Sequence, residues 1–257
     1  MALLFREVVF GPVKSRRFGR SLGINLLPLE NKLCNFNCVY CECGWTDLKT
    51  QHASYTPKKE LLQIISSEFE RISSNGLEID RITFAGNGEP TMHPAFEEIL
   101  YKVADLRDQY FPGKNIVVLS NGALLGKSGI YQALLKADER VLKLDAGNQD
   151  LFSRINGPLS HKNLNWYIDR LKAFEGKLSI QTLFLKGLVN GLSVDNSTDV
   201  AVNDWLNCLS IIRPSSVMLY TLDRETPAED LHKVSLSRLN EIALKVKDLG
   251  MEAKVYG

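Results

Sequence analysis

Strand-like and helix-like segments alternate along most of the chain, and this order limits the fold to a few architectures. Leu61, Ile65 and Phe69 repeat at helical spacing, for example, and the β-rich run Arg81–Ala85 follows them. Six such βα units in series predict parallel strands joined by right-handed crossovers. They form either a partial barrel or an open doubly wound sheet, which periodicity does not separate. The predicted strands are Ser21–Leu27, Arg81–Ala85, Asn115–Leu119, Arg140–Leu144, Lys177–Leu185, Ser216–Tyr220 and a short last one, Glu252–Tyr256.

The segments between the predicted strands favour helices. Thr56-Pro57 is typical of a helix start, with Thr56 as the N-cap and Pro57 at the first helical position. The polar stretch Leu188–Asp199 is instead predicted to be one long loop, more often a surface excursion than a lid. The predicted helices cover about 57–74, 96–106, 127–136, 161–174, 203–212 and 235–249.

Composition agrees with one enzyme-sized domain spanning residues 1–257, because a chain of 257 residues can bury a large single core. The formal net charge of +1 gives no general attraction to a polyanion or an anionic membrane. No apolar run approaches the roughly 18 residues of a membrane span. The free thiols, without an export signal, indicate a cytoplasmic protein.

Three thiols, Cys34, Cys38 and Cys41, lie at C-x3-C-x2-C spacing in one short segment. Three thiolates hold three irons of a cubane cluster and leave the fourth iron open to a ligand, which indicates a catalytic cluster. Zinc bound with the help of Cys43 is the alternative, although one residue between Cys41 and Cys43 is cramped for two ligands of one tetrahedral ion. A disulfide framework is not expected, since five cysteines are an odd number. Cys208 is expected to be buried and inert on a helix.

A second motif follows the second predicted strand, where residues 86–90 read Gly-Asn-Gly-Glu-Pro. Gly86 and Gly88 would let the backbone approach a ligand closely. Pro90 stiffens the exit from the turn. Glu89 adds an anionic acceptor suited to an ammonium group. Alone, Gly-Glu-Pro also fits an ordinary strand-to-helix turn, but it is far more specific when it follows the cysteine segment.

The cysteine segment, with Tyr40 as its aromatic residue, and the Gly-Glu motif resemble the radical S-adenosylmethionine (SAM) superfamily. The resemblance implies a partial (β/α)6 TIM-like barrel with parallel strands. It also implies one 4Fe–4S cluster held by Cys34, Cys38 and Cys41, whose open iron is chelated by SAM. In that family the reduced cluster cleaves SAM to methionine and a 5′-deoxyadenosyl radical, which abstracts hydrogen from a substrate. A reductant such as flavodoxin or ferredoxin is the implied electron donor.

Polar residues gather where the predicted strands end, and in α/β barrels the active site lies at the C-terminal strand ends. Ser120 and Asn121 are candidates for binding the SAM carboxylate or ribose, and a strand-ending Asx turn explains them equally well. Lys143 and Asp145 lie two residues apart on a strand and so point to the same face. They would bind SAM or pair with each other.

Further SAM contacts are expected from an aromatic residue and an amide. Tyr40 would lie near the adenine, with core packing as the alternative. Gln181 or Thr182 would contact SAM, and the sequence does not tell which of them points inward. No residue is assigned a catalytic role. The expected SAM-binding residues are Tyr40, Gly86, Gly88, Glu89, Ser120, Asn121, Lys143, Asp145 and Gln181.

Several runs resemble one subfamily, the wyosine-synthase-like iron–sulfur oxidoreductases: Gly11–Ile24, Asp145–Pro158, Gln181–Gly187 and Thr221–Asp230. Authentic wyosine synthases modify tRNA and hold a second cluster through upstream cysteines, and no cysteine precedes Cys34 here. The balanced charge also lacks the basic footprint of a tRNA binder, so tRNA is not the expected partner. The alternatives are an activase of a glycyl radical enzyme, whose frequent ferredoxin-like insert is absent, and a non-enzymatic iron–sulfur or zinc scaffold.

The predicted mouth of the barrel suggests the chemistry of the substrate. The mouth segments are Lys14–Arg20, Asn148–Pro158, Leu188–Asp199 and Asp223–Asp230. They offer cations that look free in the sequence, which indicates a polar, anionic substrate: a small molecule, a peptide or a nucleotide. A solvated basic turn explains Lys14–Arg20 equally well. The cations are Arg16, Arg17, Arg154 and Arg224.

Overall fold

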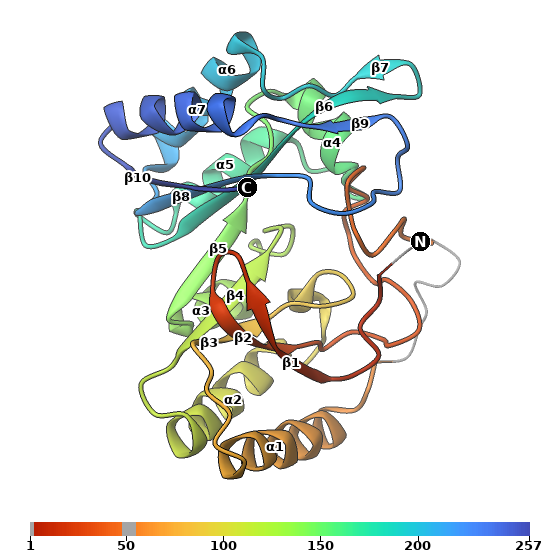
Figure 1. Cartoon of the computed structure of the whole chain (residues 1–257), viewed down its shortest axis with the longest axis vertical. Helices are drawn as coiled ribbons and strands as arrows, with labels where there is room; N and C mark the ends of the chain where they lie inside the picture. The colour runs from red at the N-terminus through yellow and green to blue at the C-terminus, as the bar shows by residue number, and fades with distance from the viewer. Residues whose placement is uncertain (1–2, 48–54) are drawn as a thin grey trace.

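The computed structural model describes residues 3–47 and 55–257, and it shows strands and helices in the expected alternation (Figure 1). The strands are β1 (Val9–Ser15), β2 (Gly19–Ile24), β3 (Arg81–Phe84), β4 (Asn115–Ser120), β5 (Glu139–Lys143), β6 (Ser179–Val189), β7 (Leu192–Ser193), β8 (Ser216–Thr221), β9 (Leu231–Lys233) and β10 (Glu252–Tyr256). The helices are α1 (Lys58–Ser74), the 3₁₀ turn η2 (Pro90–Met92), α2 (Phe96–Tyr110), α3 (Ser128–Lys136), α4 (Gln149–Asn156), α5 (Leu164–Lys172), α6 (Asp199–Ile212) and α7 (Leu236–Asp248).

The sheet advances in chain order, as β1-β2-β3-β4-β5-β6-β8-β10. All neighbours from β2 to β10 pair in parallel, whereas β1 pairs antiparallel with β2 at the edge. The register sets Ile24 beside Phe84 and Phe84 beside Val118, so these strands end at one level. This open order confirms the expected partial barrel and gathers the C-terminal strand ends at one mouth.

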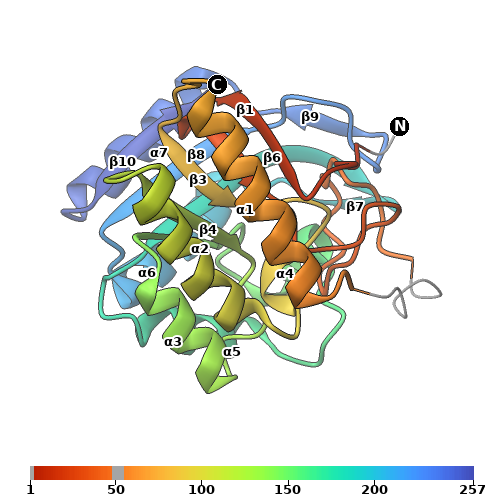
Figure 2. The same cartoon turned by 90° about the horizontal axis from the view of Figure 1, so that it is seen from below.

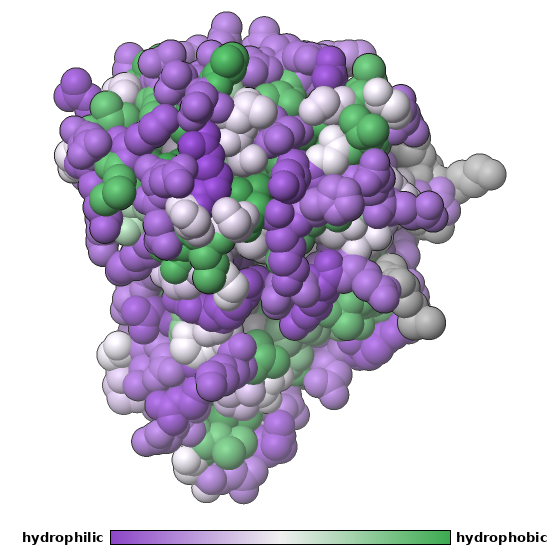
Figure 3. Space-filling model, turned by 45° about the horizontal axis from the view of Figure 1, so that its top comes forward, coloured by the Kyte–Doolittle hydropathy of each residue, from purple (hydrophilic) through white to green (hydrophobic). Residues whose placement is uncertain are grey.

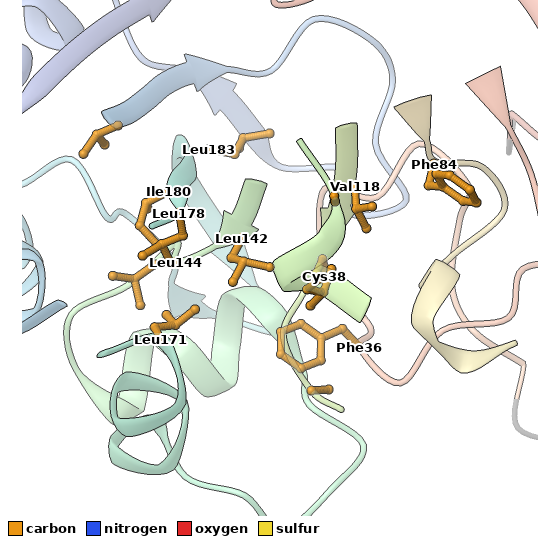
Figure 4. Packing of buried hydrophobic residues seen from close by; sticks show 14 of the residues in the cluster. Phe36, Cys38, Phe84, Val118, Leu142, Leu144, Leu171, Leu178, Ile180 and Leu183 are labelled. Carbon is orange, nitrogen blue, oxygen red and sulfur yellow. The ribbon is translucent and has the colours of Figure 1, made fainter. Parts of the chain in front are cut away.

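Helices cover the outer face of the curved sheet. Viewed from below, α1, α2 and α3 lie side by side, and the contacts continue from α5 through α6 to α7 (Figure 2). The main core lies between helices and sheet, where Phe84, Val118 and Leu142 from successive strands are buried with Leu171 of α5 (Figure 4). Burying a parallel sheet under crossover helices in this way is what the βα repeat requires.

A second, smaller apolar cluster fills the inner face of the barrel. Successive residues of a strand point to opposite faces, so Val117 lies inside while Val118 lies in the main core. Val141 and Met218 join Val117, and Phe18 from the β1–β2 turn closes the cluster. The polar C-terminal ends of the strands therefore lie at the mouth, and apolar side chains fill the barrel interior below them.

Four elements were not expected from the sequence. Strand β1 was missed because only Val9 among its seven residues is buried, as suits an edge strand, and its last two residues belong to the basic stretch Lys14–Arg20. Helix α4 was missed because it is short and polar, and the segment Asn148–Pro158 was expected to be a mouth loop. The predicted loop Leu188–Asp199 is partly a hairpin, in which β6 extends to Val189 and pairs with β7; β9 also pairs with β6.

Helix starts differ from expectation by a few residues. Helix α1 begins at Lys58 with extended Pro57 as its N-cap, so Thr56 does not cap it. Helix α5 begins later than predicted, behind Asn163, whose side chain accepts from the Trp166 N–H. Helix α6 begins earlier, because Thr198 caps it through the Ala201 N–H.

The surface drawn in Figure 3 is largely hydrophilic, with hydrophobic residues scattered in small patches. Such scatter is normal for a folded protein. Among the helices in the described residues, none has the length and apolar character needed to cross a membrane.

We expect Asn196→Ala to lower the free energy of unfolding by about 2 kcal/mol or more, because it leaves buried backbone groups without hydrogen-bond partners. The Asn196 side chain accepts from the Leu185 N–H (2.8 Å) and donates to the carbonyls of Asp145 (2.7 Å) and Leu183 (2.8 Å). Urea denaturation measures the loss. Exposed Ser193→Ala in the same segment serves as the control and should change stability by less than about 0.5 kcal/mol; equal effects would contradict the anchoring role of Asn196.

Candidate functional site

An open pocket of about 150 Å³ lies at the C-terminal ends of the central strands, and it brings together nearly all the residues expected to bind the cluster and SAM. Of these residues only Asp145 does not line it. The pocket also contains four residues that the sequence analysis did not select, Lys32, Phe36, Cys43 and Leu119. The expected residues in its lining are Cys34, Cys38, Tyr40, Cys41, Gly86, Gly88, Glu89, Ser120, Asn121, Lys143 and Gln181.

The cysteine loop, residues 33–44, is held by backbone bonds on two sides. On one side Leu33 bridges Gly88: the Leu33 N–H donates to Asn87 O (2.8 Å) and the Glu89 N–H donates to Leu33 O (3.1 Å). On the other side the Val39 N–H donates to Ile155 O (2.9 Å) at the end of α4. The segment containing α4, expected to be a free mouth loop, therefore forms part of the support of the cysteines.

All the cysteines in the described residues are free thiols. The Asn121 amide donates to the Cys34 sulfur and the Asn156 amide donates to the Cys38 sulfur, each at 3.6 Å. Burial raises the pKa of Cys34 to about 12 and also raises that of Cys38. Amide donors and a bound cluster's positive iron would both stabilise the thiolates that burial disfavours, so these residues fit a metal cluster.

Cys41 and Cys43 interact with each other rather than forming two further ligands of one ion. The Cys43 side chain, opposed by burial, lowers the pKa of Cys41 to about 5 while the pKa of Cys43 is raised. The Cys43 thiol itself donates to Gly86 O at 3.6 Å. Throughout 3–47 and 55–257, no three His, Cys, Asp or Glu side chains are grouped as ligands of a single metal ion would be. A wider cluster suits three thiols spread around one pocket better than zinc does.

The two glycines of the Gly-Asn-Gly-Glu turn allow close approach of the chain to itself. A Cβ added to Gly88 would lie 1.9 Å from Leu33 O, and Gly88 has a φ of +139°. A Cβ added to Gly86 would lie 2.3 Å from the Asn25 side-chain oxygen. Both residues line the pocket, but Gly88 directly allows the cysteine loop to dock against this turn, and Gly86 allows the turn to pack against Asn25 after β2.

Glu89 is a buried carboxylate with several donors. Its Oε1 accepts from the hydroxyls of Thr91 and Ser120, the latter at 2.8 Å, and its Oε2 accepts from the Asn121 N–H at 2.7 Å. Burial raises the pKa of Glu89, although these hydrogen bonds oppose the rise. A cation arriving in the pocket would relieve the same desolvation, which makes this oxygen pair a fitting acceptor for an ammonium group.

Ser120 and Asn121 lie in the expected strand-ending turn and also line the pocket. The Asn121 side-chain oxygen accepts from the Ala123 N–H at 2.9 Å, which is the expected Asx turn. Its amide nitrogen donates to the Asn35 side chain at 2.7 Å and so reaches the cysteine loop. Ser120 and Asn121 thus position Glu89 and the loop while their side chains also line the pocket.

Tyr40, Lys143 and Asp145 form a buried polar cluster beside the cysteines. The Tyr40 hydroxyl donates to Asp145 and accepts from Lys143, and the Lys143 ammonium lies 3.3 Å from the Asp145 carboxylate. Burial alone would lower the pKa of Lys143, but Asp145, Tyr220 and Cys38 together outweigh it and the pKa is raised. Lys143 and Asp145 do share a face and pair with each other, and Asp145 supports the pocket wall from behind.

Asp145 also connects this cluster to its surroundings. Its carboxylate accepts from the Leu183 N–H at 3.0 Å and from the Asn156 amide at 2.6 Å. Asn156, at the end of α4, thereby contacts both Asp145 and Cys38. Asn156 was not predicted from the sequence to be a site residue, although it lies in the run Asp145–Pro158 that resembles wyosine-synthase-like oxidoreductases.

The structure decides which residue of the pair Gln181-Thr182 faces the pocket. Gln181 lines it, whereas the Thr182 hydroxyl donates to Leu144 O at 2.8 Å on the other face of β6. Another residue missed by sequence reasoning is Lys32, which is buried and donates to Gly44 O at 2.8 Å within the cysteine loop. Lys32 adds a positive charge to the pocket next to the thiols.

Three of the four arginines expected to be free cations are paired. Arg16 lies 3.6 Å from Asp223, Arg154 lies 2.6 Å from Asp150, and Arg224 lies 2.7 Å from Glu42. Arg17 is different: it donates to the Gln181 side-chain oxygen at 2.5 Å. The expectation that these arginines are free cations is therefore wrong for Arg16, Arg154 and Arg224, which neighbouring carboxylates neutralise.

Two proteins of similar sequence extend over most of this chain. GTPase Obg of Brachyspira hyodysenteriae is 34% identical over 226 residues, which are 86% of this chain and 31% of that protein. A UPF0026 protein of Helicobacter pylori strain J99 is 33% identical over 221 residues, 84% of this chain and 67% of that protein. The chain thus spans about a third of the first relative and two thirds of the second.

Solved structures agree on the fold. A radical SAM methyltransferase from Sphaerobacter thermophilus superposes with a TM-score of 0.65 at 17% identity, over 91% of this chain and 65% of that one.

The wyosine-synthase-like subfamily stays a prediction, because the matching family description covers the whole superfamily. That description, the Radical SAM superfamily, matches residues 32–188, more than half of the chain. The match, over the very residues that build the pocket, shows that this chain belongs to the radical SAM superfamily.

Proposed function

We propose that this protein is a radical SAM enzyme that acts on a polar, anionic substrate at the barrel mouth. When bound, a reduced 4Fe–4S cluster and SAM would supply methionine and a 5′-deoxyadenosyl radical that removes hydrogen from that substrate. Superfamily membership supports both cofactors. The observation that carries the proposal is one pocket lined by the free thiols of Cys34, Cys38 and Cys41, by buried Glu89 and by polar residues of β4, β5 and β6.

In this proposal Cys34, Cys38 and Cys41 hold the cluster. They lie on one clamped loop, so their positions are set before any metal arrives. The side-chain amides of Asn121 and Asn156 donate to two of the sulfurs. Such donors change the reduction potential of a cluster as well as stabilising it. Cys43, whose side chain lowers the pKa of Cys41, would not be a ligand.

Glu89 would hold the SAM ammonium, and the opposite wall would hold its anionic and hydroxyl groups. Lys143 suits the carboxylate because it is a buried, fully protonated ammonium at the pocket surface. Gln181 and Asn121 offer amides to ribose hydroxyls, and Tyr40 presents a ring to the adenine. Asp145 acts through Tyr40 and Lys143, as a positioning residue.

Three further expectations belong with this proposal. The described chain works as one domain, since one mouth collects residues from the cysteine loop to β6. Reduction requires an external donor such as flavodoxin or ferredoxin. A cytoplasmic location fits free thiols and a cluster of this kind.

We expect Cys34→Ala, Cys38→Ala and Cys41→Ala each to abolish cluster binding after anaerobic reconstitution, because each removes one of three thiolates. Cys43→Ala is the matched control in the same loop and should retain the cluster. Iron and acid-labile sulfide analysis, with visible absorbance, measures the outcome. One zinc per chain without sulfide, or loss of the cluster in Cys43→Ala, would contradict the assignment.

The reduced wild-type protein should convert SAM to 5′-deoxyadenosine and methionine slowly even without substrate. The reason is that cleavage requires only bound SAM and a cluster that an external donor has reduced. Liquid chromatography of the products checks this, with unreduced protein as the control. Formation of S-adenosylhomocysteine alone would indicate ordinary methyl transfer instead.

Glu89→Gln should weaken SAM binding by about tenfold to a hundredfold, since a charged hydrogen bond is lost while the shape is kept. Cluster content should stay unchanged because Glu89 is not an iron ligand. Equilibrium binding of SAM and iron analysis are read on the same samples. Glu98→Ala, at a carboxylate exposed on α2, is the control. A Glu89 variant that loses the cluster yet binds SAM normally would refute this role.

A further inference from the structure

A second and larger pocket, the groove, has a volume of about 650 Å³ and opens at the barrel mouth beside the cofactor pocket. Its size is that of sites for drug-sized small molecules. Its apolar lining comes from the N-terminal segment and β1, namely Leu3, Phe5 and Val13. Its charged lining comes from the end of β1, the β1–β2 turn, the cysteine loop and the segment after β8. The charged residues are Lys14, Arg16, Arg17, Glu42, Asp223, Arg224 and Glu225.

Arg17 is the residue that connects this groove to the cofactor pocket. It lines the groove, and its guanidinium donates at 2.5 Å to the side chain of Gln181, which lines the pocket. The guanidinium carbon lies 4.6 Å from the centre of the Tyr220 ring and 5.3 Å from that of Phe18. Two aromatic rings and one amide therefore fix the orientation of this half-buried cation.

The charge of Arg17 is not neutralised by any carboxylate in the part of the chain that the structure describes. Its neighbours Arg16 and Arg224 are each paired, with Asp223 and Glu42. A half-buried cation without an anionic partner is disfavoured unless it gains one. A planar guanidinium presents several N–H donors in a fork that matches a carboxylate or a phosphate.

The groove is also connected to the cofactor pocket. A small pocket between the two larger ones is lined by Tyr40 on the cofactor side and by Glu42 and Arg224 on the groove side. A molecule held at Arg17 with its body along the groove would thus have one end directed at the cofactor pocket. The apolar lining would contact the rest of that body.

We propose that Arg17 binds the carboxylate or phosphate of a small-molecule substrate whose apolar part lies against Leu3, Phe5 and Val13. This inference rests on the proposed function, because it assigns that function its substrate class. Either anion satisfies the guanidinium fork, so the experiment compares the two directly. A substrate of this size occupies the groove without involving a macromolecular partner.

The probes are phenyl phosphate and benzoate, with benzamide as the uncharged control, titrated calorimetrically into reconstituted, SAM-saturated protein. The wild type should bind at least one anionic probe and bind benzamide much more weakly. Arg17→Gln should weaken that binding about tenfold or more, and Arg17→Lys should weaken it less because the charge remains. Arg170→Gln removes an arginine that also faces an aromatic ring, on outer helix α5, and should leave binding unchanged.

Cluster content and uncoupled 5′-deoxyadenosine formation at saturating SAM are measured on the same variants, and they should not change. If those readouts are normal but neither anion binds, or Arg17→Gln binds as the wild type does, the inference about Arg17 is wrong while the proposed function stands. Absence of a cluster in the wild type would instead refute the proposed function.

Discussion

The backbone contact between Leu33 and Gly88 is the constraint on which the site depends. It joins the first residue of the cysteine loop to the turn that carries Glu89, through two hydrogen bonds of 2.8 and 3.1 Å. Only a residue without a side chain fits there, because a Cβ on Gly88 would lie 1.9 Å from a carbonyl oxygen. The thiols and the carboxylate are therefore held at a fixed spacing by the chain itself.

Buried charge shapes the rest of the pocket. Glu89 and Lys143 are both removed from water, and each is supported by neighbours that partly offset the cost of burial. Asp145 compensates Lys143, while hydroxyl and backbone donors support Glu89. Opposite charges on facing walls suit a zwitterionic ligand such as the methionyl end of SAM. Arranging them before binding reduces the reorganisation that binding requires.

The sequence predicted the alternating fold and most of the pocket because both depend on local signals. Cys34, Cys38 and Cys41 follow from their spacing, and parallel βα order brings the strand ends to one mouth. It did not predict the roles of Asn156 or Lys32, since their contacts join segments far apart in the chain. The pairing of Arg16 with Asp223 and of Arg224 with Glu42 was missed for the same reason. Helix α4 was missed because it is short and polar.

The backbone bonds on two sides of the cysteine loop have a consequence for how the thiols are held. Many small metal domains fold only when the metal binds, because nothing else orders their ligands. Here the loop is bonded to the turn after β3 and to the end of α4, so backbone hydrogen bonds help to hold the thiols in place. A substitution at one cysteine therefore leaves the backbone support of the other two intact.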